Sequence, residues 1–405
     1  LHARDRAEML DELDAVAAGT GTKPATAGRR AQPVTFAFTG QGSQWTGLAR
    51  ELRRAEPVCA AVLDECAAHL RGHLEVPLET LLDDDPLETT DRAQVAIVAT
   101  QVALVTLLGE WGVRAGAVVG HSVGELTAAW AAGVLDLPDL LRTTALRGRL
   151  MAAAPGSGAM AVVRAGVAET RAAIAATPGL EIAADNGPNV TTISGPADAV
   201  AAFLAATQLR ATPLPVAHAF HSAAMAGVTG PLAEHLAGVG LRPPSIPFAS
   251  TLTGRLHTAE TATDPASYAG AVRAAVLFGP AAAELDARVP ADRSHIWWEI
   301  GPQPALLPLL RRIADPREGR TRFRATLRRG EGVAPLHRAL ADHHNETTTE
   351  MELAAHHRGK PHTSVPIPTY PFARTRLSAL PGAVPTAADV ARHPFLDGRS
   401  GGLAS

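Results

Sequence analysis

Short apolar runs alternate along the chain with longer stretches in which apolar residues recur every three or four positions. The short runs predict buried strands, because the strands of a parallel sheet are covered on both faces. They lie at 34–38, 115–119, 246–250 and 295–299. The longer stretches predict helices, and these lie at 94–111, 140–151, 225–239, 265–283 and 302–313. Strands that alternate with helices in this way predict an α/β fold.

Between residues 157 and 222 the predicted elements become shorter. Strands are expected at 159–164, 180–184, 189–194 and 211–217, with helices at 167–176 and 197–206. The resulting order β-α-β-β-α-β is that of a ferredoxin-like unit. We therefore expect a small ferredoxin-like α+β subdomain, residues 157–222, inserted into a large α/β-hydrolase-like subdomain with a parallel sheet, residues 33–156 and 223–314.

Both ends of the chain differ from this regular pattern. Residues 1–32 combine a charged helix at 5–16 with a linker rich in Gly, Thr, Lys and Arg. From 315 to 380 the pattern loosens into an arginine-rich stretch and a polar, histidine-rich stretch, which predicts a solvated linker before a tail at 381–405. The histidines there lack Cys or carboxylate partners at ligand spacing, so we expect no metal site; they are His343, His344, His356, His357 and His362.

Composition narrows the class of protein. The chain has 405 residues, is 46% hydrophobic and 19% charged, and carries a formal net charge of −3, which argues against a nucleic-acid partner. We expect no membrane span and no signal peptide, and hence a cytoplasmic location. Cys59 and Cys66 are two helical turns apart and are expected to face one core, not to form a disulfide or zinc site. The first residue is Leu1, which suggests a piece of a longer chain.

The segment Gly120-His121-Ser122-Val123-Gly124 carries the strongest chemical signal. It follows a predicted strand and precedes a predicted helix, and Gly-x-Ser-x-Gly in that context indicates a nucleophile elbow. The backbone N–H of Val123, at the start of the helix, is placed to stabilise an oxyanion. The alternative is a Gly/Ser turn between a core strand and a core helix. The context favours an enzyme that forms an acyl-serine.

A serine nucleophile needs a base. His218 and His221 lie where the small subdomain returns to the large one, a natural place for a cleft. A histidine satisfied within the core is the alternative at this position. The glycine-rich segment 40–45 follows the strand at 34–38, but it lacks the lysine and spacing of a P-loop, so we reject phosphate binding there.

Four motifs in this order resemble those of malonyl-CoA:acyl-carrier-protein transacylases, most closely the acyltransferase domains of type I polyketide synthases. They are GQGSQ at 40–44, GHSVG at 120–124, RGRLM at 147–151 and HAFHS at 218–222. The resemblance spans roughly residues 34–310. Residues 1–32 are similar to the end of the linker that follows a ketosynthase domain. Residues 368–374 are similar to the segment that returns over that linker, and 393–396 to the start of a dehydratase domain.

The resemblance implies a ping-pong acyltransferase with a Ser–His dyad. Ser122 would be the nucleophile and His221 its general base, oriented by a backbone carbonyl. The N–H groups of Gln41 and Val123 would form the oxyanion hole. Arg147 would bind the free carboxylate of the acyl group, for which the planar guanidinium fork is well suited.

Two further assignments are less direct. Gln94 is a candidate pocket residue, although Val95 follows it where the family usually has proline. Asp185 and Asp198 lie between the serine and the histidine, where a common hydrolase order places an acid, but the dyad leaves both unassigned.

The resemblance also implies the substrate and the partners. His218 and Phe220 match malonyl-selective members, and Val123 agrees; Phe220 would fill the volume that an α-methyl group needs. Malonyl-CoA would be the substrate, with no bound cofactor, and the phosphopantetheine thiol of an acyl carrier protein would be the acceptor. Carrier proteins of this kind are usually acidic, so we expect basic residues at the cleft mouth or within Arg317–Arg329 to receive them.

Two other functions compete with this one. A serine hydrolase or thioesterase would share the serine and the histidine, but it would have no use for Arg147. A non-catalytic docking module would have no reason to keep both Ser122 and His221. The sequence alone does not exclude these two functions.

Overall fold

The computed structural model describes residues 6–18, 32–83, 86–314, 320–347 and 355. Contacts divide the chain into two units, 1–360 and 361–405, and all the helices and strands named below belong to the first. Four predicted features lie outside the described residues: the segments 368–374 and 393–396, the tail 381–405, and the histidines His356, His357 and His362.

The helices run in chain order as α1 (Arg6–Ala17), α2 (Arg50–Ala55), α3 (Pro57–Leu70), α4 (Leu78–Asp83), α5 (Thr90–Glu110), α6 (Gly124–Ala131), α7 (Leu137–Ala152), α8 (Val167–Ile174), α9 (Ala197–Ala206), the 3-10 turn η1 (Ala223–Met225), α10 (Ala226–Ala237), α11 (Ala259–Ala262), α12 (Pro265–Gly270), α13 (Phe278–Ala287), α14 (Leu307–Ile313) and α15 (Ala334–Glu346).

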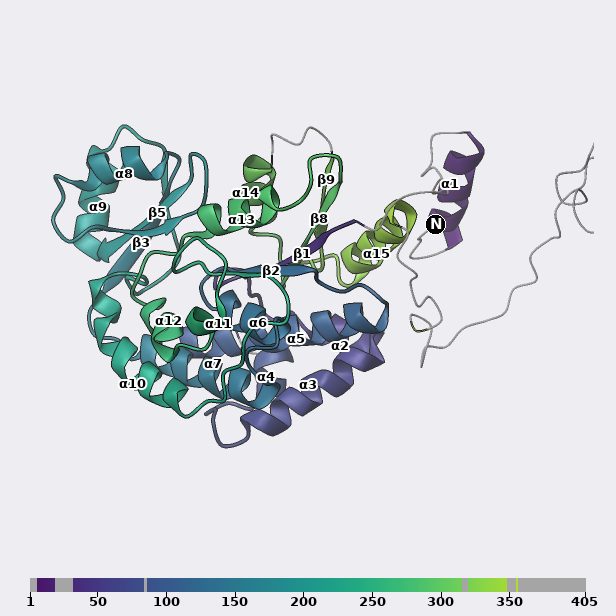
Figure 1. Ribbon diagram of the computed structural model, residues 1–405, viewed down its shortest axis with the longest axis horizontal. Coiled ribbons are helices and arrows are strands. Elements are labelled where there is room, and N and C mark those ends of the chain that lie inside the picture. Colours follow the sequence, from purple (N-terminus) through teal and green to yellow (C-terminus); the bar gives the residue numbers. More distant parts are fainter. Residues whose placement is uncertain (1–5, 19–31, 84–85, 315–319, 348–354, 356–405) are drawn as a thin grey trace, which may run out of the picture. The chain divides into compact units, whose positions relative to one another are not determined.

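A five-stranded parallel sheet carries the larger part of this unit (Figure 1). Its strands are β1 (Val34–Phe38), β2 (Ala117–Gly120), β7 (Phe248–Ala249), β8 (His295–Ile300) and β9 (Thr321–Ala325). The spatial order is β7-β2-β1-β8-β9. The predicted α/β fold with a parallel sheet is confirmed.

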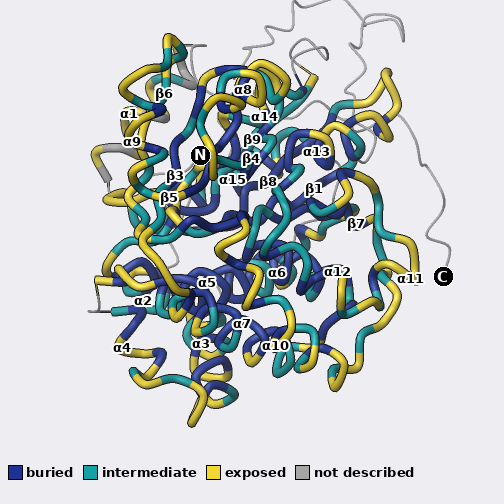
Figure 2. The backbone as a smooth tube through the Cα atoms, turned by 90° about the vertical axis from the view of Figure 1, so that its left-hand side faces the viewer, coloured by how far each residue is buried: buried dark blue, intermediate teal, exposed yellow. Residues whose placement is uncertain are grey.

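The two faces of this sheet belong to different apolar clusters, because successive side chains of a strand point to opposite faces. Phe36, Phe38 and Trp298 share one cluster with residues of α3, α5 and α7. Ala37 and Trp297 share the other with residues of α13 and α14. The strands β1 and β8 are buried along their whole length (Figure 2). Both faces are therefore covered, which explains why the strands are continuous apolar runs.

The central helix α5 corrects one expectation. It is long and apolar enough to cross a membrane by length and composition, although the sequence was expected to contain no such stretch. In the structure 78% of its most apolar window is buried inside the protein, as in the core helix of a globular domain. Its neighbours are α3, α7 and the parallel sheet. Cys59 and Cys66, on α3, are both buried in the same core, as expected.

A second sheet of four antiparallel strands forms the small subdomain. Its strands are β3 (Gly158–Val163), β4 (Glu181–Asp185), β5 (Thr191–Pro196) and β6 (Ala211–Pro213). They lie in the order β4-β5-β3-β6, and α8 and α9 pack against them (Figure 1). The predicted β-α-β-β-α-β order is confirmed. The small sheet also pairs with the large subdomain, through a bridge between Ala184 and Val276.

The expectation of a loosely structured linker from residue 315 was wrong for two elements. Strand β9 pairs in parallel register with β8, and α15 packs against β9. His343 of α15 is buried against Trp298, and burial lowers its pKa to about 4, whereas His344 is exposed. In the described part of the chain, no three His, Cys, Asp or Glu side chains gather as a metal site requires.

Candidate active site

The turn between β2 and α6 holds Ser122 in a left-handed backbone conformation, with φ +53°. Only glycines fit on either side of it. A Cβ on Gly120 would lie 2.2 Å from the carbonyl carbon of Gly124, and a Cβ on Gly124 would lie 2.4 Å from the Phe38 oxygen. A non-glycine residue at positive φ is a strained position that persists where the surroundings impose it. The strand–turn–helix geometry of a nucleophile elbow is therefore present.

The two N–H groups expected in the oxyanion hole lie at matching positions in the turns that follow two neighbouring strands. Phe38 of β1 pairs with Gly120 of β2, and Gln41 and Val123 each follow three residues later. Neither of these N–H groups donates a hydrogen bond to another described residue. Both are available for an oxyanion beside Ser122.

His221 completes a dyad with Ser122. The serine Oγ lies 2.8 Å from His221 Nε2. On the other side of the ring, Nδ1 lies 3.0 Å from the backbone oxygens of both Ala271 and Ala274. Carbonyl oxygens only accept hydrogen bonds, so Nδ1 carries the proton and Nε2 is left to accept one.

No carboxylate takes part in orienting His221 among the described residues. Asp185 accepts a hydrogen bond from the Gly187 N–H, and Asp198 accepts one from the Ala199 N–H at the start of α9. Both aspartates, left unassigned from the sequence, thus have local structural partners.

The carbonyl oxygens of Ala271 and Ala274 can accept a hydrogen bond from His221 because one continuous helix does not run through them. The prediction of a single helix over 265–283 was wrong. The chain forms α12, leaves the helical conformation after residue 270, and begins α13 at Phe278. Pro280 lies in the first turn of α13, where a missing N–H is tolerated. In hindsight Gly279 and Pro280 were the signal for a new helix start.

Arg147 reaches the serine from α7. Its Nη2 donates to Ser122 Oγ at 3.1 Å, and its Nη1 donates to Gln94 Oε1 at 2.6 Å. The residue is 4% exposed, and burial lowers its pKa to about 10, so it stays cationic at neutral pH. No carboxylate of a described residue forms an ion pair with it. The carboxylate of buried Glu125 acts on it only through space, without an ion pair. A buried cation without a directly bonded anion is costly and marks a candidate site for an anion from outside.

Gln94 holds the guanidinium in place. It is buried in α5, and its Nε2 lies 3.5 Å from Gln41 Oε1 and 3.4 Å from Met151 Sδ. Gln41 in turn donates to Thr90. A continuous chain of polar contacts therefore joins the loop after β1 to Arg147 and Ser122.

Of the expected specificity residues, Val123 directly follows Ser122, and His218 and Phe220 lie just before His221 in sequence. Among the described residues, no hydrogen bond or ring contact joins His218 or Phe220 to Ser122. Phe220, directly before His221, is 7% exposed and belongs to the large apolar core. His218 is half-buried, with its ring centroid 5.7 Å from that of Phe220.

Sequence reasoning missed two residues that support the elbow. His121 Nε2 lies 2.9 Å from Asn186 Oδ1, on the loop after β4. Asn186 also donates to Thr192 Oγ1 of β5. These contacts tie the nucleophile's neighbour to the small subdomain. A lone asparagine in a Gly/Pro-rich loop gave no signal for this role.

Electrostatics keeps the base neutral. Burial, together with the positive charge of Arg147 and the electrostatic interaction with His121, lowers the pKa of His221 to about 3. Burial also lowers the pKa of His121. A neutral imidazole at physiological pH is the form that accepts a proton from serine.

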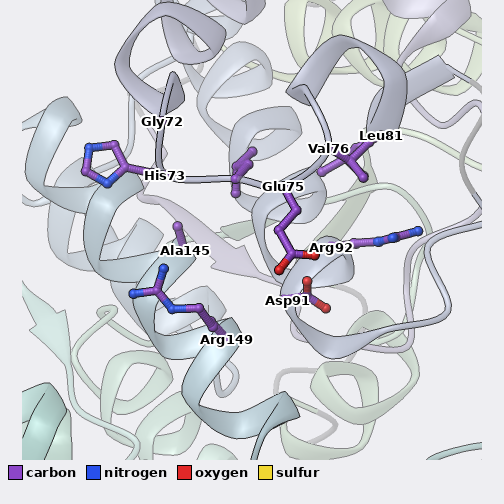
Figure 3. Close-up of a pocket in the computed structure, with 10 residues that line it drawn as sticks. Gly72, His73, Glu75, Val76, Leu81, Asp91, Arg92, Ala145 and Arg149 are labelled. Carbon is purple, nitrogen blue, oxygen red and sulfur yellow. The ribbon is translucent and has the colours of Figure 1, made fainter.

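A recess of about 190 Å³ lies on the other face of α7, lined among others by Glu75, Asp91 and Arg149 (Figure 3). Arg149 is two residues from Arg147, and two residues of helix turn the side chain by about 200°. Gly148 lies between them, where a Cβ would be 2.8 Å from the Asp91 Cα. The close packing of α5 on α7 thus separates this recess from Ser122.

Comparisons with known proteins agree with the geometry. Residues 35–359 match the family described as acyl transferase domain. The polyketide synthase GfsE of Streptomyces halstedii is 35% identical over 377 residues, which cover 92% of this chain and 10% of GfsE. The chain therefore spans about a tenth of that relative's length.

Two solved structures are also similar. The acyltransferase domain from the second module of the salinomycin polyketide synthase has a TM-score of 0.77 and 35% identity, covering 92% of this chain and 88% of that one. The acyl transferase domain of SpnD, solved in complex with 2-(pent-4-yn-1-yl)malonyl, has a TM-score of 0.74 and 31% identity, covering 84% and 81%.

Proposed function

Because the chain belongs to the acyl transferase domain family, as an acyltransferase domain of a modular type I polyketide synthase, we propose that it transfers malonyl units. Malonyl-CoA loads Ser122, and the phosphopantetheine thiol of an acyl carrier protein then receives the group. By the same resemblance, residues 1–32 are the end of a linker that follows a ketosynthase domain, and residues 393–396, in the tail 381–405, are similar to the start of a dehydratase domain.

The dyad supports both half-reactions. His221 Nε2 takes the Ser122 proton as Oγ attacks the thioester carbon, and the oxyanion lies against the N–H groups of Gln41 and Val123. The C–S bond then breaks, and the CoA sulfur takes the proton from His221. In the second half-reaction the carrier thiol gives its proton to His221 and attacks the ester, and Ser122 Oγ leaves with that proton.

The observation that supports an acyl group with a free carboxylate is the guanidinium of Arg147, which has no ion-pair partner among the described residues and lies 3.1 Å from Ser122 Oγ. The choice of malonyl within that class rests on the resemblance at His218, Phe220 and Val123. An acyl group bound to Ser122 with a free carboxylate would supply the missing anion. The malonyl derivative named for the SpnD structure carries such a carboxylate, which supports the same assignment.

A hydrolase with the same dyad is the competing function. The two are distinguished by following malonyl-CoA with and without pantetheine as acceptor thiol. A transferase converts pantetheine to malonyl-pantetheine much faster than it releases malonate, because water attack on the acyl-serine must be slow. Rapid malonate release that pantetheine does not suppress would instead establish a hydrolase.

The low pKa of His221 predicts an unusual pH dependence. A base must be neutral, so loading should persist well below pH 6.5, the ordinary imidazole pKa, and fall only as His221 protonates. In the malonyl-enzyme the carboxylate offsets the charge of Arg147, so the pKa of His221 rises above its value in the free enzyme. Transfer should therefore lose its rate at a higher pH than kcat/KM for loading, which reports the free enzyme. The pH dependence of kcat/KM for loading and of the single-turnover rate of transfer, with circular dichroism to confirm folding, provides the measurement. An acid limb at about pH 6.5 for both steps would contradict the electrostatic account.

Extender selectivity provides a second expected outcome. The variant His218→Tyr/Phe220→Ser should raise methylmalonyl loading relative to malonyl loading by about tenfold, since one methyl group is worth roughly 1–3 kcal/mol. Competition between the two CoA esters measures the ratio. Because truncation of a buried Phe removes about 3–5 kcal/mol of stability, melting temperature must be followed too. Phe220→Leu, which keeps most of the bulk, is the control. An unchanged ratio in a folded double variant would place selectivity elsewhere.

A further inference from the structure

Three arginines without a charged partner surround one recess at the edge of the small subdomain. Arg164 directly follows β3, Arg210 directly precedes β6, and Arg312 lies in the last turn of α14. The recess has a volume of about 620 Å³ and is completed by Pro188 and Asn189. All three arginine side chains are exposed, and none forms an ion pair with another described residue. The recess therefore has a concentrated positive charge.

The arginine-rich stretch 317–329, expected from the sequence to receive an acidic partner, is different. Arg324 pairs with Glu346 of α15, and Arg328 pairs with Glu331. Arg322 also lies 3.5 Å from Glu346. Three cations of this stretch therefore have acidic neighbours within the fold, whereas the three at the recess have none among the described residues.

One short loop connects the recess to the nucleophile elbow. Asn186 bonds to His121, the residue before Ser122, and Asn189 lines the recess three residues later. Three residues span at most about 10 Å. Gly187, between them, packs against Ile313, the neighbour of Arg312. The loop that lines the recess therefore also contacts the residue directly before Ser122.

The recess also spans both parts of the fold. Arg164 and Arg210 lie on neighbouring strands, joined by a hydrogen bond from the Arg164 N–H to the Arg210 carbonyl, whereas Arg312 belongs to the large subdomain. A ligand that touches all three contacts both sides of the boundary between the subdomains.

We propose that Arg164, Arg210 and Arg312 form the docking surface for an acidic carrier protein that presents its thiol arm to Ser122. This inference rests on the proposed function. The open recess and the exposed guanidinium groups on separate elements suit a convex protein surface better than one small anion. Exposed charges at an interface mainly raise the association rate and fix orientation.

The test separates the two half-reactions. In the variant Arg164→Glu/Arg210→Glu/Arg312→Glu, loading from malonyl-CoA and transfer to pantetheine, a neutral thiol, should stay within about twofold of wild type. The second-order rate of transfer to an acidic holo acyl carrier protein should fall about a hundredfold at low salt, and less at high salt, because the lost interaction is screened. The control is Arg171→Glu, an exposed arginine of α8 outside the recess.

Each other outcome has a definite meaning. Carrier transfer as fast in the triple variant as in the Arg171→Glu control would overturn the docking surface. An increased KM for malonyl-CoA, with carrier transfer unchanged relative to pantetheine, would assign the recess to CoA phosphates and also overturn it. Failure of the wild-type protein to load malonyl would refute the proposed function itself. Melting temperatures of the variants exclude unfolding as the cause of any loss.

Discussion

Replacing Ser122 with alanine is expected to abolish acyl transfer while leaving the protein folded. In the proposed mechanism the Ser122 Oγ becomes acylated, and His221 and Arg147 both contact it, at 2.8 and 3.1 Å. Loss of a serine nucleophile lowers kcat by a factor on the order of 10⁴–10⁶. Alanine adopts the same turn with no larger steric demand, so the melting temperature should change little.

The rate of malonyl transfer from CoA to pantetheine measures this effect. Ser194→Ala is the matched control, because Ser194 is fully buried in β5 and its hydroxyl has no partner among the described residues. The control should retain near wild-type transfer. If Ser122→Ala kept transfer within tenfold of that control, another group would be the nucleophile.

Replacing Arg147 with alanine is expected to change the choice of acyl group. Malonyl loading loses the cation that pairs with its carboxylate, whereas acetyl loading has no such carboxylate. A buried charge left without its partner costs about 3–5 kcal/mol, so the malonyl-to-acetyl ratio should fall by roughly two to four orders of magnitude. The ratio of the two loading rates, each from single-turnover measurement, gives the effect directly.

Arg149→Ala is the control for this experiment. It removes an arginine from the same helix, but from the face that lines the separate recess (Figure 3). Its ratio should equal that of wild type. Equal losses of malonyl and acetyl loading in the Arg147 variant would mean that the guanidinium organises Ser122 and Gln94 without binding the substrate carboxylate.

The local pattern of apolar and polar residues correctly predicted much of the fold. The strand 34–38 and the helix 197–206 have the predicted bounds, because their apolar residues pack where their period places them. The pattern failed at β9, where Arg322 and Arg324 flank Phe323 on an edge strand. Both arginines interact with Glu346 of α15, so their charge is satisfied by a helix that the sequence did not predict.

In the candidate site, too, some groups can be recognised from their neighbours in sequence and others cannot. Ser122, Val123 and Arg147 lie in motifs whose chemistry can be recognised from neighbouring residues. The oxygens of Ala271 and Ala274 cannot be recognised in that way, because every residue has a carbonyl and only the break between α12 and α13 turns these two toward His221.

The central claim is that Ser122 carries a malonyl group next to the charge of Arg147. Intact-protein mass spectrometry after brief exposure to equal concentrations of malonyl-CoA and acetyl-CoA tests it most directly, followed by peptide mapping and then by addition of holo acyl carrier protein. We expect one malonyl group per chain, on the peptide that contains Ser122, and its disappearance when the carrier is added. A chain that stays unmodified, takes up mainly acetyl, or carries the malonyl group on another residue would contradict it.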